Sequence, residues 1–268
     1  MVYGQLDLLN MIPQKQLGQH FLVQKSAVKV IADSALAATA PRLLEIGPGQ
    51  GAITESLLAD GRHLWAVDLD PIAIKLVSER FREFDHFHPV CGDAVSVPLN
   101  FDGPISVVGN LPYNAATAIL TRFLLQPIPW ERMVFMFQLE VGRKLMGKPG
   151  DREYGPLSIL TQLTCQLSRV IKLGPMAFYP APKVDSIVIL FKPKKSDLPL
   201  NLRSEFLALL RVGFKYRRKT LANNLRELSV PVGVKKIFKM ADLPENIRAE
   251  AISPDVWLNI FNIILSFA

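Results

Sequence analysis

Cysteine and long apolar runs are scarce in this chain of 268 residues, and each scarcity excludes a class of protein. Its two cysteines, Cys91 and Cys165, are too few for a disulfide framework and lack the paired spacing of a metal site, so we expect both to be buried thiols of a reducing compartment. No apolar run approaches the roughly 18 residues of a membrane span, and residues 1–12 lack the basic-then-apolar pattern of a leader. The sequence therefore predicts a cytoplasmic protein with no membrane partner.

Metal and phosphate motifs are missing as well. His86 and His88 are spaced like paired ligands, but no third partner lies nearby in the sequence, and two such imidazoles more often flank a strand. No Gly-Lys-Ser/Thr follows the glycine-rich turn at residues 47–51, which argues against a phosphate-binding loop. We therefore expect no metal site.

Positive charge exceeds negative charge, and most of the excess lies in the last quarter of the chain. Residues 1–192 carry 18 Lys and Arg against 17 Asp and Glu, whereas residues 193–268 carry 13 against 7. The densest stretch, residues 211–219, has five cations with Phe214 and Tyr216 among them. Such a pattern is typical of a surface that binds a polyanion, although a solvated helix face has the same composition. Because few acidic residues lie nearby to neutralise it, we favour a nucleic-acid partner.

Short apolar strands alternate with helices through the first three quarters of the chain. We expect strands at residues 42–46, 64–67, 87–90, 105–108, 133–137, near 170 and at 187–191, with helices at 25–38, 52–59, 71–84, 115–125, 140–145 and 157–165. This alternation predicts an α/β fold in which helices cover both faces of a parallel sheet. A polar, proline-flanked connector at 193–199 predicts a boundary between a domain of residues 1–192 and an all-α domain of residues 193–268. The second domain should contain helices at 202–214, 219–228, 232–240 and 254–267.

Polar residues follow successive strands, at the edge of an α/β sheet where ligands bind. In the first strand–turn–helix unit, Gly47 and Gly49 let the backbone approach a ligand closely. Asp68 ends the next strand twenty-one residues after Gly47, where a carboxylate suits a ribose diol. This pattern fits NAD and S-adenosylmethionine equally well. Asp93 follows the third strand and could accept from a cofactor adenine amine, although a turn or helix-cap aspartate is the plainer interpretation.

The most informative motif follows the fourth strand and consists of Asn110, Leu111, Pro112 and Tyr113. The Asn110 carboxamide oxygen and the Leu111 carbonyl could accept the two hydrogens of an adenine N6 amine, while Tyr113 stacks on the ring. Pro112 would stiffen this backbone. The alternative is an ordinary β-turn. Polar residues at four strand ends in series favour a binding site.

The chain resembles the KsgA-type small-subunit rRNA adenine N6,N6-dimethyltransferases over nearly its full length. Besides the motifs at residues 45–49 and 110–113, it carries Gln-Leu-Gly-Gln-His-Phe-Leu at 16–22, Phe-Tyr-Pro-Ala-Pro-Lys-Val-Asp-Ser at 178–186, Arg-Arg-Lys-Thr-Leu at 217–221 and Asn-Asn-Leu at 223–225. The resemblance implies a Rossmann-like class I S-adenosylmethionine-dependent methyltransferase sheet, with an antiparallel strand at its end, followed by a small all-α domain.

The resemblance also implies a role for each site residue. S-adenosylmethionine, which yields S-adenosylhomocysteine, would be bound by His20, Leu22, Gly47, Asp68 at the ribose, Asp93 at the adenine and Asn110. The catalytic motif would be Asn110, Leu111, Pro112 and Tyr113, and RNA would be bound by Lys183, Arg217, Arg218 and Lys219. Three residues depart from the usual pattern: His20 replaces a frequent Asn, while Leu139 and Pro156 replace Lys and Arg and so remove two positive charges.

The implied reaction is two methyl transfers to N6 of each of two adjacent adenosines near the 3′ end of 16S rRNA, coupled to small-subunit biogenesis. The partner would be small-subunit rRNA or an immature 30S particle, and the enzyme a monomer. Three alternatives remain: a large-subunit adenine methyltransferase of the macrolide-resistance type, a DNA adenine methylase, and a non-catalytic ribosome-assembly or transcription factor. The motifs at 178–186 and 217–221 argue against the first, and the lack of a sequence-reading domain argues against the second. The intact Asp68, Asp93 and Asn110 argue against the third.

Overall fold

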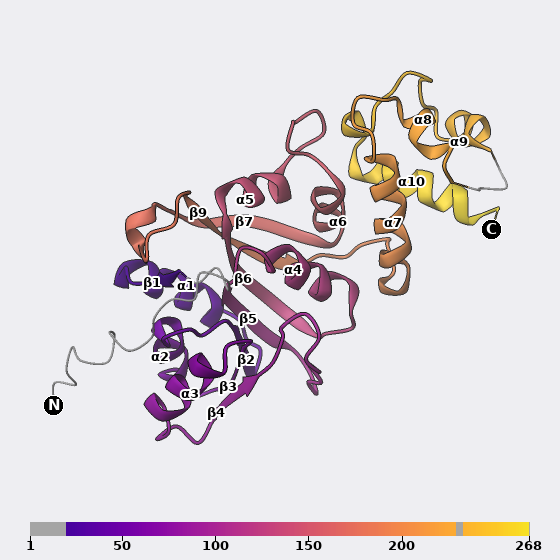
Figure 1. Ribbon diagram of the computed structural model, residues 1–268. Coiled ribbons are helices and arrows are strands. Elements are labelled where there is room, and N and C mark those ends of the chain that lie inside the picture. Colours follow the sequence, from indigo (N-terminus) through magenta and orange to yellow (C-terminus); the bar gives the residue numbers. More distant parts are fainter. Residues whose placement is uncertain (1–19, 229–232, 268) are drawn as a thin grey trace. The chain divides into compact units, whose positions relative to one another are not determined.

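The computed structural model describes residues 20–228 and 233–267 (Figure 1). Most of the motif at 16–22 and the start of the helix expected at 232–240 therefore lie outside the described residues. The chain forms two compact units. The first contains residues up to 123 together with 127–142 and 168–193, and the second contains 124–126, 143–167 and 194–268. The last limit lies within one residue of the expected domain boundary, but residues 143–167 group with the second unit.

A seven-stranded sheet in the order β4-β3-β2-β5-β6-β9-β7 forms the centre of the first unit (Figure 1). Neighbouring strands from β4 to β6 are parallel, and β9 is antiparallel to β6. The antiparallel strand implied by the resemblance is thus present, but it lies inside the sheet, with β7 beyond it. The strands are β2 (Arg42–Ile46), β3 (His63–Asp68), β4 (Phe87–Cys91), β5 (Ile105–Asn110), β6 (Trp130–Gln138), β7 (Cys165–Leu173) and β9 (Ser186–Pro193). The α/β prediction is confirmed.

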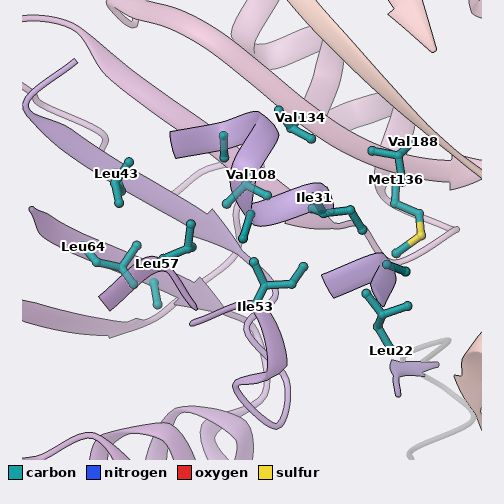
Figure 2. Close-up of a cluster of buried hydrophobic side chains, with 14 of the residues drawn as sticks. Leu22, Ile31, Leu43, Ile53, Leu57, Leu64, Val108, Val134, Met136 and Val188 are labelled. Atoms are coloured by element: carbon teal, nitrogen blue, oxygen red, sulfur yellow. The ribbon is translucent and has the colours of Figure 1, made fainter. Parts of the chain in front are cut away.

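Helices precede, connect and follow the parallel strands, and their apolar residues complete the core. These helices are α1 (Lys25–Leu36), α2 (Ala52–Leu58), α3 (Pro71–Arg80), α4 (Ala116–Leu125) and α5 (Leu139–Met146). The β5 strand is buried on both faces as far as Gly109, as a central parallel strand requires. Around it, Leu43, Leu57, Leu64 and Val134 form one continuous cluster of buried side chains (Figure 2).

The order of the strands places the polar strand ends together. From β2 the chain continues to β3 and β4 on one side and returns to β5 on the other side. The carboxyl ends of β2 and β5 therefore flank the point where the strand order reverses, which is where ligands of open α/β sheets bind. Gly47 follows β2, Asp68 ends β3 and Asn110 ends β5.

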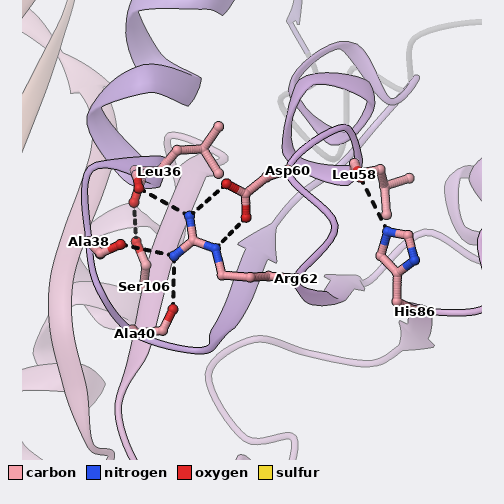
Figure 3. A network of polar contacts seen from close by, with 9 residues as sticks. Leu36, Ala38, Ala40, Leu58, Asp60, Arg62, His86 and Ser106 are labelled. Atoms are coloured by element: carbon pink, nitrogen blue, oxygen red, sulfur yellow. Dashed lines mark hydrogen bonds and ion pairs between the residues drawn. The ribbon is translucent and has the colours of Figure 1, made fainter.

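Arg62 joins the end of α1 to the turn before β3. Its guanidinium donates to the carbonyls of Leu36, Ala38 and Ala40 at 2.8–3.0 Å and forms an ion pair with Asp60 (Figure 3). The carbonyls at a helix carboxyl end lack partners within the helix and attract positive charge. Arg132 adds bonds to the Ser34 and Ala37 carbonyls of the same helix end. The two arginines together satisfy this end of α1, and Arg62 ties it to the loop that leads into β3.

The second unit is helical around two buried aromatic residues. Its helices are α6 (Pro156–Thr164), α7 (Arg203–Gly213), α8 (Leu221–Leu225), α9 (Val234–Met240) and α10 (Pro254–Leu265). Tyr154 is fully buried, and its hydroxyl donates to the Ile252 carbonyl at 2.8 Å. Trp257 is also fully buried and stacks on Phe214 with ring centroids 5.8 Å apart. These contacts explain why residues 143–167 belong with the carboxyl-terminal helices, which no local pattern in the sequence indicated.

The structure shows how the two cysteines lie, and it bears on membrane helices and metal clusters. Cys165 is buried, but Cys91 is exposed, so the expectation of two buried thiols was wrong for Cys91. Cys91 is the last residue of β4, which lies at the edge of the sheet in the part of the chain that the structure describes. Within residues 20–228 and 233–267, no helix is both long and apolar enough to cross a membrane. The same residues contain no cluster of three or more His, Cys, Asp or Glu side chains that could hold a metal ion.

Candidate functional site

A pocket lies at the carboxyl ends of β2, β3 and β5, within the first unit. It is lined by His20, Phe21, Ile46, Gly47, Gly49, Val67, Asp68, Leu69, Asp93, Ala94, Asn110, Leu111, Pro112, Tyr113, Asn114, Ala115 and Ile119. The structure thus brings together every residue expected to bind the cofactor or to act in catalysis except Leu22.

Leu22 was expected to bind the cofactor, but Phe21, for which no role was expected, lines the pocket in its place. Leu22 is 5% exposed and belongs to the hydrophobic core, whereas the preceding Phe21 lines the pocket. Both form β1 (Phe21–Leu22), in which neighbouring side chains point to opposite sides. The alternation of a strand could have indicated that only one of the two faces the ligand, but a two-residue strand gives no pattern from which to choose.

The glycine turn provides open backbone beside the pocket. Gly47 and Gly49 have φ values of +71° and +53°, a region that L side chains rarely adopt. A Cβ on Gly49 would lie 3.1 Å from the Phe21 ring, and one on Gly47 would lie 3.4 Å from the Asn110 carbonyl oxygen. The pocket wall therefore needs glycine at both positions, in keeping with a ligand that lies against the backbone.

Asp68 is held by backbone amides of Gly49, Leu69 and Asp70. One carboxylate oxygen accepts from the Asp70 amide at 3.0 Å, and the other accepts from the Gly49 amide at 3.4 Å. Burial raises the pKa of Asp68, and these backbone hydrogen bonds oppose that shift. A carboxylate has about four lone-pair positions, so Asp68 retains acceptor capacity for a hydroxyl group of a ligand.

Glu45 is a buried carboxyl group that the sequence marked only as a strand end. It is 1% exposed, and its Oε2 accepts from the Thr54 hydroxyl at 2.6 Å. Burial raises its pKa to about 7; the Thr54 hydrogen bond opposes this shift and the charge of Asp68 adds to it. The burial of Glu45 limits the negative charge around Asp68 at low pH, because Glu45 then stays protonated.

The Asn110 carboxamide has a defined orientation. Its Nδ2 donates to the backbone carbonyl of His20 at 2.9 Å. A carbonyl can only accept, so the amino end of the carboxamide must face His20 and the oxygen Oδ1 must point elsewhere. Since Asn110 lines the pocket, this contact leaves Oδ1 available there as an acceptor.

Tyr113 is fixed at both ends of its ring. Its hydroxyl lies 2.9 Å from the Oγ of Ser186, which is fully buried, and its ring centroid lies 5.6 Å from that of His20. His20 is held in turn by Nδ1, which lies 2.7 Å from the Pro180 carbonyl oxygen. The sequence did not reveal these partners, because Ser186 is 73 residues from Tyr113 and Pro180 is 160 residues from His20.

Asp93 fits both interpretations that the sequence left open. Its Oδ1 accepts from the Val95 amide at 2.8 Å, as a turn aspartate does. It also lines the pocket. One oxygen is therefore engaged in the turn, and the same residue forms part of the pocket wall.

The basic residues expected to bind RNA differ in their surroundings. Lys183 is exposed in the loop before β9, and Arg218 and Lys219 are exposed after α7. Arg217 is exposed too, but it donates to the Tyr154 carbonyl at 3.2 Å and so contributes to the second unit itself. Leu139 and Pro156, which stand where similar chains carry cations, both lie at the start of a helix. Leu139 begins α5. Pro156 begins α6, where the missing N–H removes no hydrogen bond of the helix.

The chain is similar to known proteins in sequence and in fold. The sequence profile of the family described as ribosomal RNA adenine dimethylase matches residues 12–266. The chain belongs to this family. It is 36% identical over 260 residues to the ribosomal RNA small subunit methyltransferase A of Thermosynechococcus vestitus, covering 94% of this chain and 96% of that one. It is also 36% identical over 250 residues to the protein of that name from Geobacter sulfurreducens, covering 90% and 91%.

Solved structures of similar proteins have the same fold as this dimethylase. A dimethyladenosine transferase from Plasmodium falciparum superimposes with a TM-score of 0.79, at 23% identity, over 92% of this chain and 98% of that one. The 23S rRNA methyltransferase ErmE superimposes with a TM-score of 0.68, at 24% identity, over 91% and 99%. At these identities the likeness speaks for the fold alone. The fold class and the S-adenosylmethionine-dependent methyltransferase activity expected from the sequence are confirmed.

Proposed function

We propose that this dimethylase transfers methyl groups from S-adenosylmethionine to N6 of two adjacent adenosines near the 3′ end of 16S rRNA. The observation that carries the proposal is the orientation of Asn110, whose amino end binds the His20 carbonyl and leaves Oδ1 in the pocket. An amine with two hydrogens needs acceptors, and Asn110 Oδ1 together with the Leu111 carbonyl offers two.

The residues of the pocket divide the work of binding and reaction. Asp68 would accept from the ribose hydroxyls of the cofactor, and Asp93 from its adenine amine. The bound cofactor supplies a methyl group on a positively charged sulfur, which makes that carbon electrophilic. Asn110 and Leu111 would withdraw the amine lone pair from the ring by accepting both N6 hydrogens. Positioning of this kind accounts for much of the rate of a direct displacement.

The target base must leave its stack to reach the pocket, and Tyr113 would hold it there. Its hydroxyl is bonded to Ser186 and its ring neighbours His20, so the stacking surface is fixed before RNA arrives. Pro112 restricts the backbone between the two acceptors and this ring. A preset surface of this kind lowers the entropy lost on binding.

Small-subunit rRNA is favoured over large-subunit rRNA by sequence and not by fold. The relatives at 36% identity carry the small-subunit name, whereas the likeness to ErmE is one of fold. We propose that the enzyme acts on immature 30S particles in the cytoplasm as a monomer, and that its reaction is coupled to small-subunit biogenesis. A non-catalytic role alone would leave the Asn110 orientation without a purpose.

Residues 193–268 would form the RNA-docking part of the protein, and its exposed Arg217, Arg218 and Lys219 would bind RNA. Lys183 would add a contact from the first unit. The neighbouring Tyr216 is 43% exposed, and the Lys219 ammonium lies 4.7 Å from its ring centroid. The ring can stack on a base of single-stranded nucleic acid, and the ammonium beside it can attract a phosphate.

The test is to incubate the protein with labelled S-adenosylmethionine and separated small and large ribosomal subunits, and to map the modified nucleotides. We expect label only in small-subunit rRNA, as dimethylated adenosine at two adjacent positions. Label confined to the large subunit would support the macrolide-resistance type of reaction instead. Absence of label in both would contradict the proposal.

A further inference from the structure

The pairing of β1 with β8 (Phe178–Tyr179) shows which side chains face the pocket. In this antiparallel pair Leu22 lies opposite Phe178, and Phe21 lies opposite Tyr179. Residues directly opposite each other project on the same side of the ribbon, and neighbours project on opposite sides. Leu22 and Phe178 are both in the core, whereas Phe21 lines the pocket. The Tyr179 side chain therefore projects on the pocket side.

Tyr179 stands at the rim of the pocket and not in its wall. It is 65% exposed, whereas its partner Phe21 is 8% exposed. The next residue, Pro180, binds His20 through its carbonyl oxygen, and the His20 ring neighbours that of Tyr113. These links place Tyr179 beside the Asn110 and Tyr113 end of the pocket, where the target base would enter. Within residues 20–228 and 233–267, the Tyr179 side chain makes no hydrogen bond and no ring contact.

We propose that Tyr179 stacks on the nucleobase next to the adenosine that enters the pocket. This inference rests on the proposed function. Extrusion of one base removes a stacking partner from its neighbour, and an exposed aromatic ring replaces that partner without regard to sequence. When two adjacent adenosines are methylated, the stacked neighbour is the second adenosine of the pair. Lys183, four residues away and exposed, can contact a phosphate on the same strand.

Steady-state kinetics of Tyr179→Ala tests the contact. Stacking of one base on an aromatic side chain is worth roughly 1 to 3 kcal/mol, so KM for the RNA substrate should rise about tenfold. Affinity for S-adenosylmethionine should not change, and Tyr179→Phe should retain the wild-type KM. Phe84→Ala is a matched control, because Phe84 is 37% exposed and does not line the pocket. A wild-type KM in Tyr179→Ala would overturn the inference.

An abasic ribose on either side of the target adenosine identifies the partner of Tyr179. With wild-type enzyme, removing the stacked neighbour should raise KM about tenfold, whereas Tyr179→Ala should be insensitive to the same change. Equal losses in both proteins would show that the neighbour is bound by something else and would overturn the inference. Inactivity of wild-type enzyme on small-subunit rRNA would overturn the proposed function and this inference together. Activity without any Tyr179 effect would overturn the inference alone.

Discussion

The pocket of the first unit and the basic stretch of the second unit both present polar side chains, but they hold them differently. In the pocket, the Asn110 amide and the Tyr113 hydroxyl each have a partner at 2.9 Å. In residues 211–219, Arg218 and Lys219 extend into solvent. A methyl transfer depends on atoms aligned within a fraction of an ångström, whereas attraction to phosphate acts over several ångströms. We therefore propose that the fixed side chains of the pocket serve methyl transfer and that the exposed cations of the second unit serve RNA binding.

The basic stretch is itself divided. Lys215 is paired with Glu227 at 2.5 Å, and Arg217 binds the Tyr154 carbonyl. Phe214 is 9% exposed and stacks on Trp257, so only Tyr216 of its two aromatic residues is open to solvent. Lys215 and Arg217 thus have partners within the second unit, and we propose that Arg218 and Lys219 make the main RNA contacts of this stretch.

The largest effect should come from the fixed pocket. Asn110→Ala removes the oriented Oδ1, and loss of one such positioning contact costs about 100-fold or more in kcat. Cofactor affinity should change much less, as measured by calorimetry. Asn100→Ala alters an exposed asparagine outside the pocket and should keep full activity. A kcat near the wild-type value in Asn110→Ala would remove the contrast between the two regions.

The pH dependence of stability reports how well Glu45 is shielded from water. Its folded pKa of about 7 exceeds the ordinary value of 4.5, so the folded state holds a proton that the unfolded state releases. Stability should therefore fall as pH rises from about 4.5 to 7, by at most about 3 kcal/mol, and stay level above that range. Glu45→Gln retains an acceptor for Thr54 and should not show this fall. Chemical denaturation across that range measures it.

An exposed acid provides the control for this experiment. The Glu83 side chain is 81% exposed, so Glu83→Gln should follow the wild-type pH dependence of stability. Identical curves for wild type and Glu45→Gln would mean that water reaches the Glu45 carboxyl group.

Loss of the exposed cations Arg218 and Lys219 should affect RNA binding and leave the chemical step unchanged. Replacing Arg218 and Lys219 with Ala should weaken RNA binding and reduce the slope of log affinity against log salt by roughly 0.7 for each lost phosphate contact. The kcat at saturating RNA should be unchanged. Lys194 and Lys195 are also exposed, so their double Ala variant is the matched control. Equal slopes in the two variants would show that the stretch at 211–219 is an ordinary solvated surface.

The smallest expected effect concerns the hold on Tyr113. Tyr113→Phe and Ser186→Ala should each reduce kcat/KM several-fold, since one hydrogen bond contributes about 1 kcal/mol. The double variant should be no worse than either single variant, giving a coupling of about 1 kcal/mol. Additive losses would mean that Ser186 does not act through Tyr113.

The sequence predicted the elements and most of the pocket because both depend on local patterns. Gly47, Asp68 and Asn110 follow strands of recognisable composition, and parallel strands bring such ends to one edge. The contacts that orient these residues could not be predicted in the same way. They join backbone carbonyls and buried hydroxyls across 73 to 160 residues, and no periodicity connects such partners. Burial of Glu45 likewise depends on strands that pair with β2 from elsewhere in the chain.

The partners of His20 and Tyr113 have a consequence for the timing of synthesis. The motif at residues 110–113 leaves the translating ribosome well before Pro180 and Ser186 are added. A nascent chain that ends before Pro180 therefore contains the proposed reacting motif without the partners of His20 and Tyr113. We expect a chain truncated there to methylate no RNA.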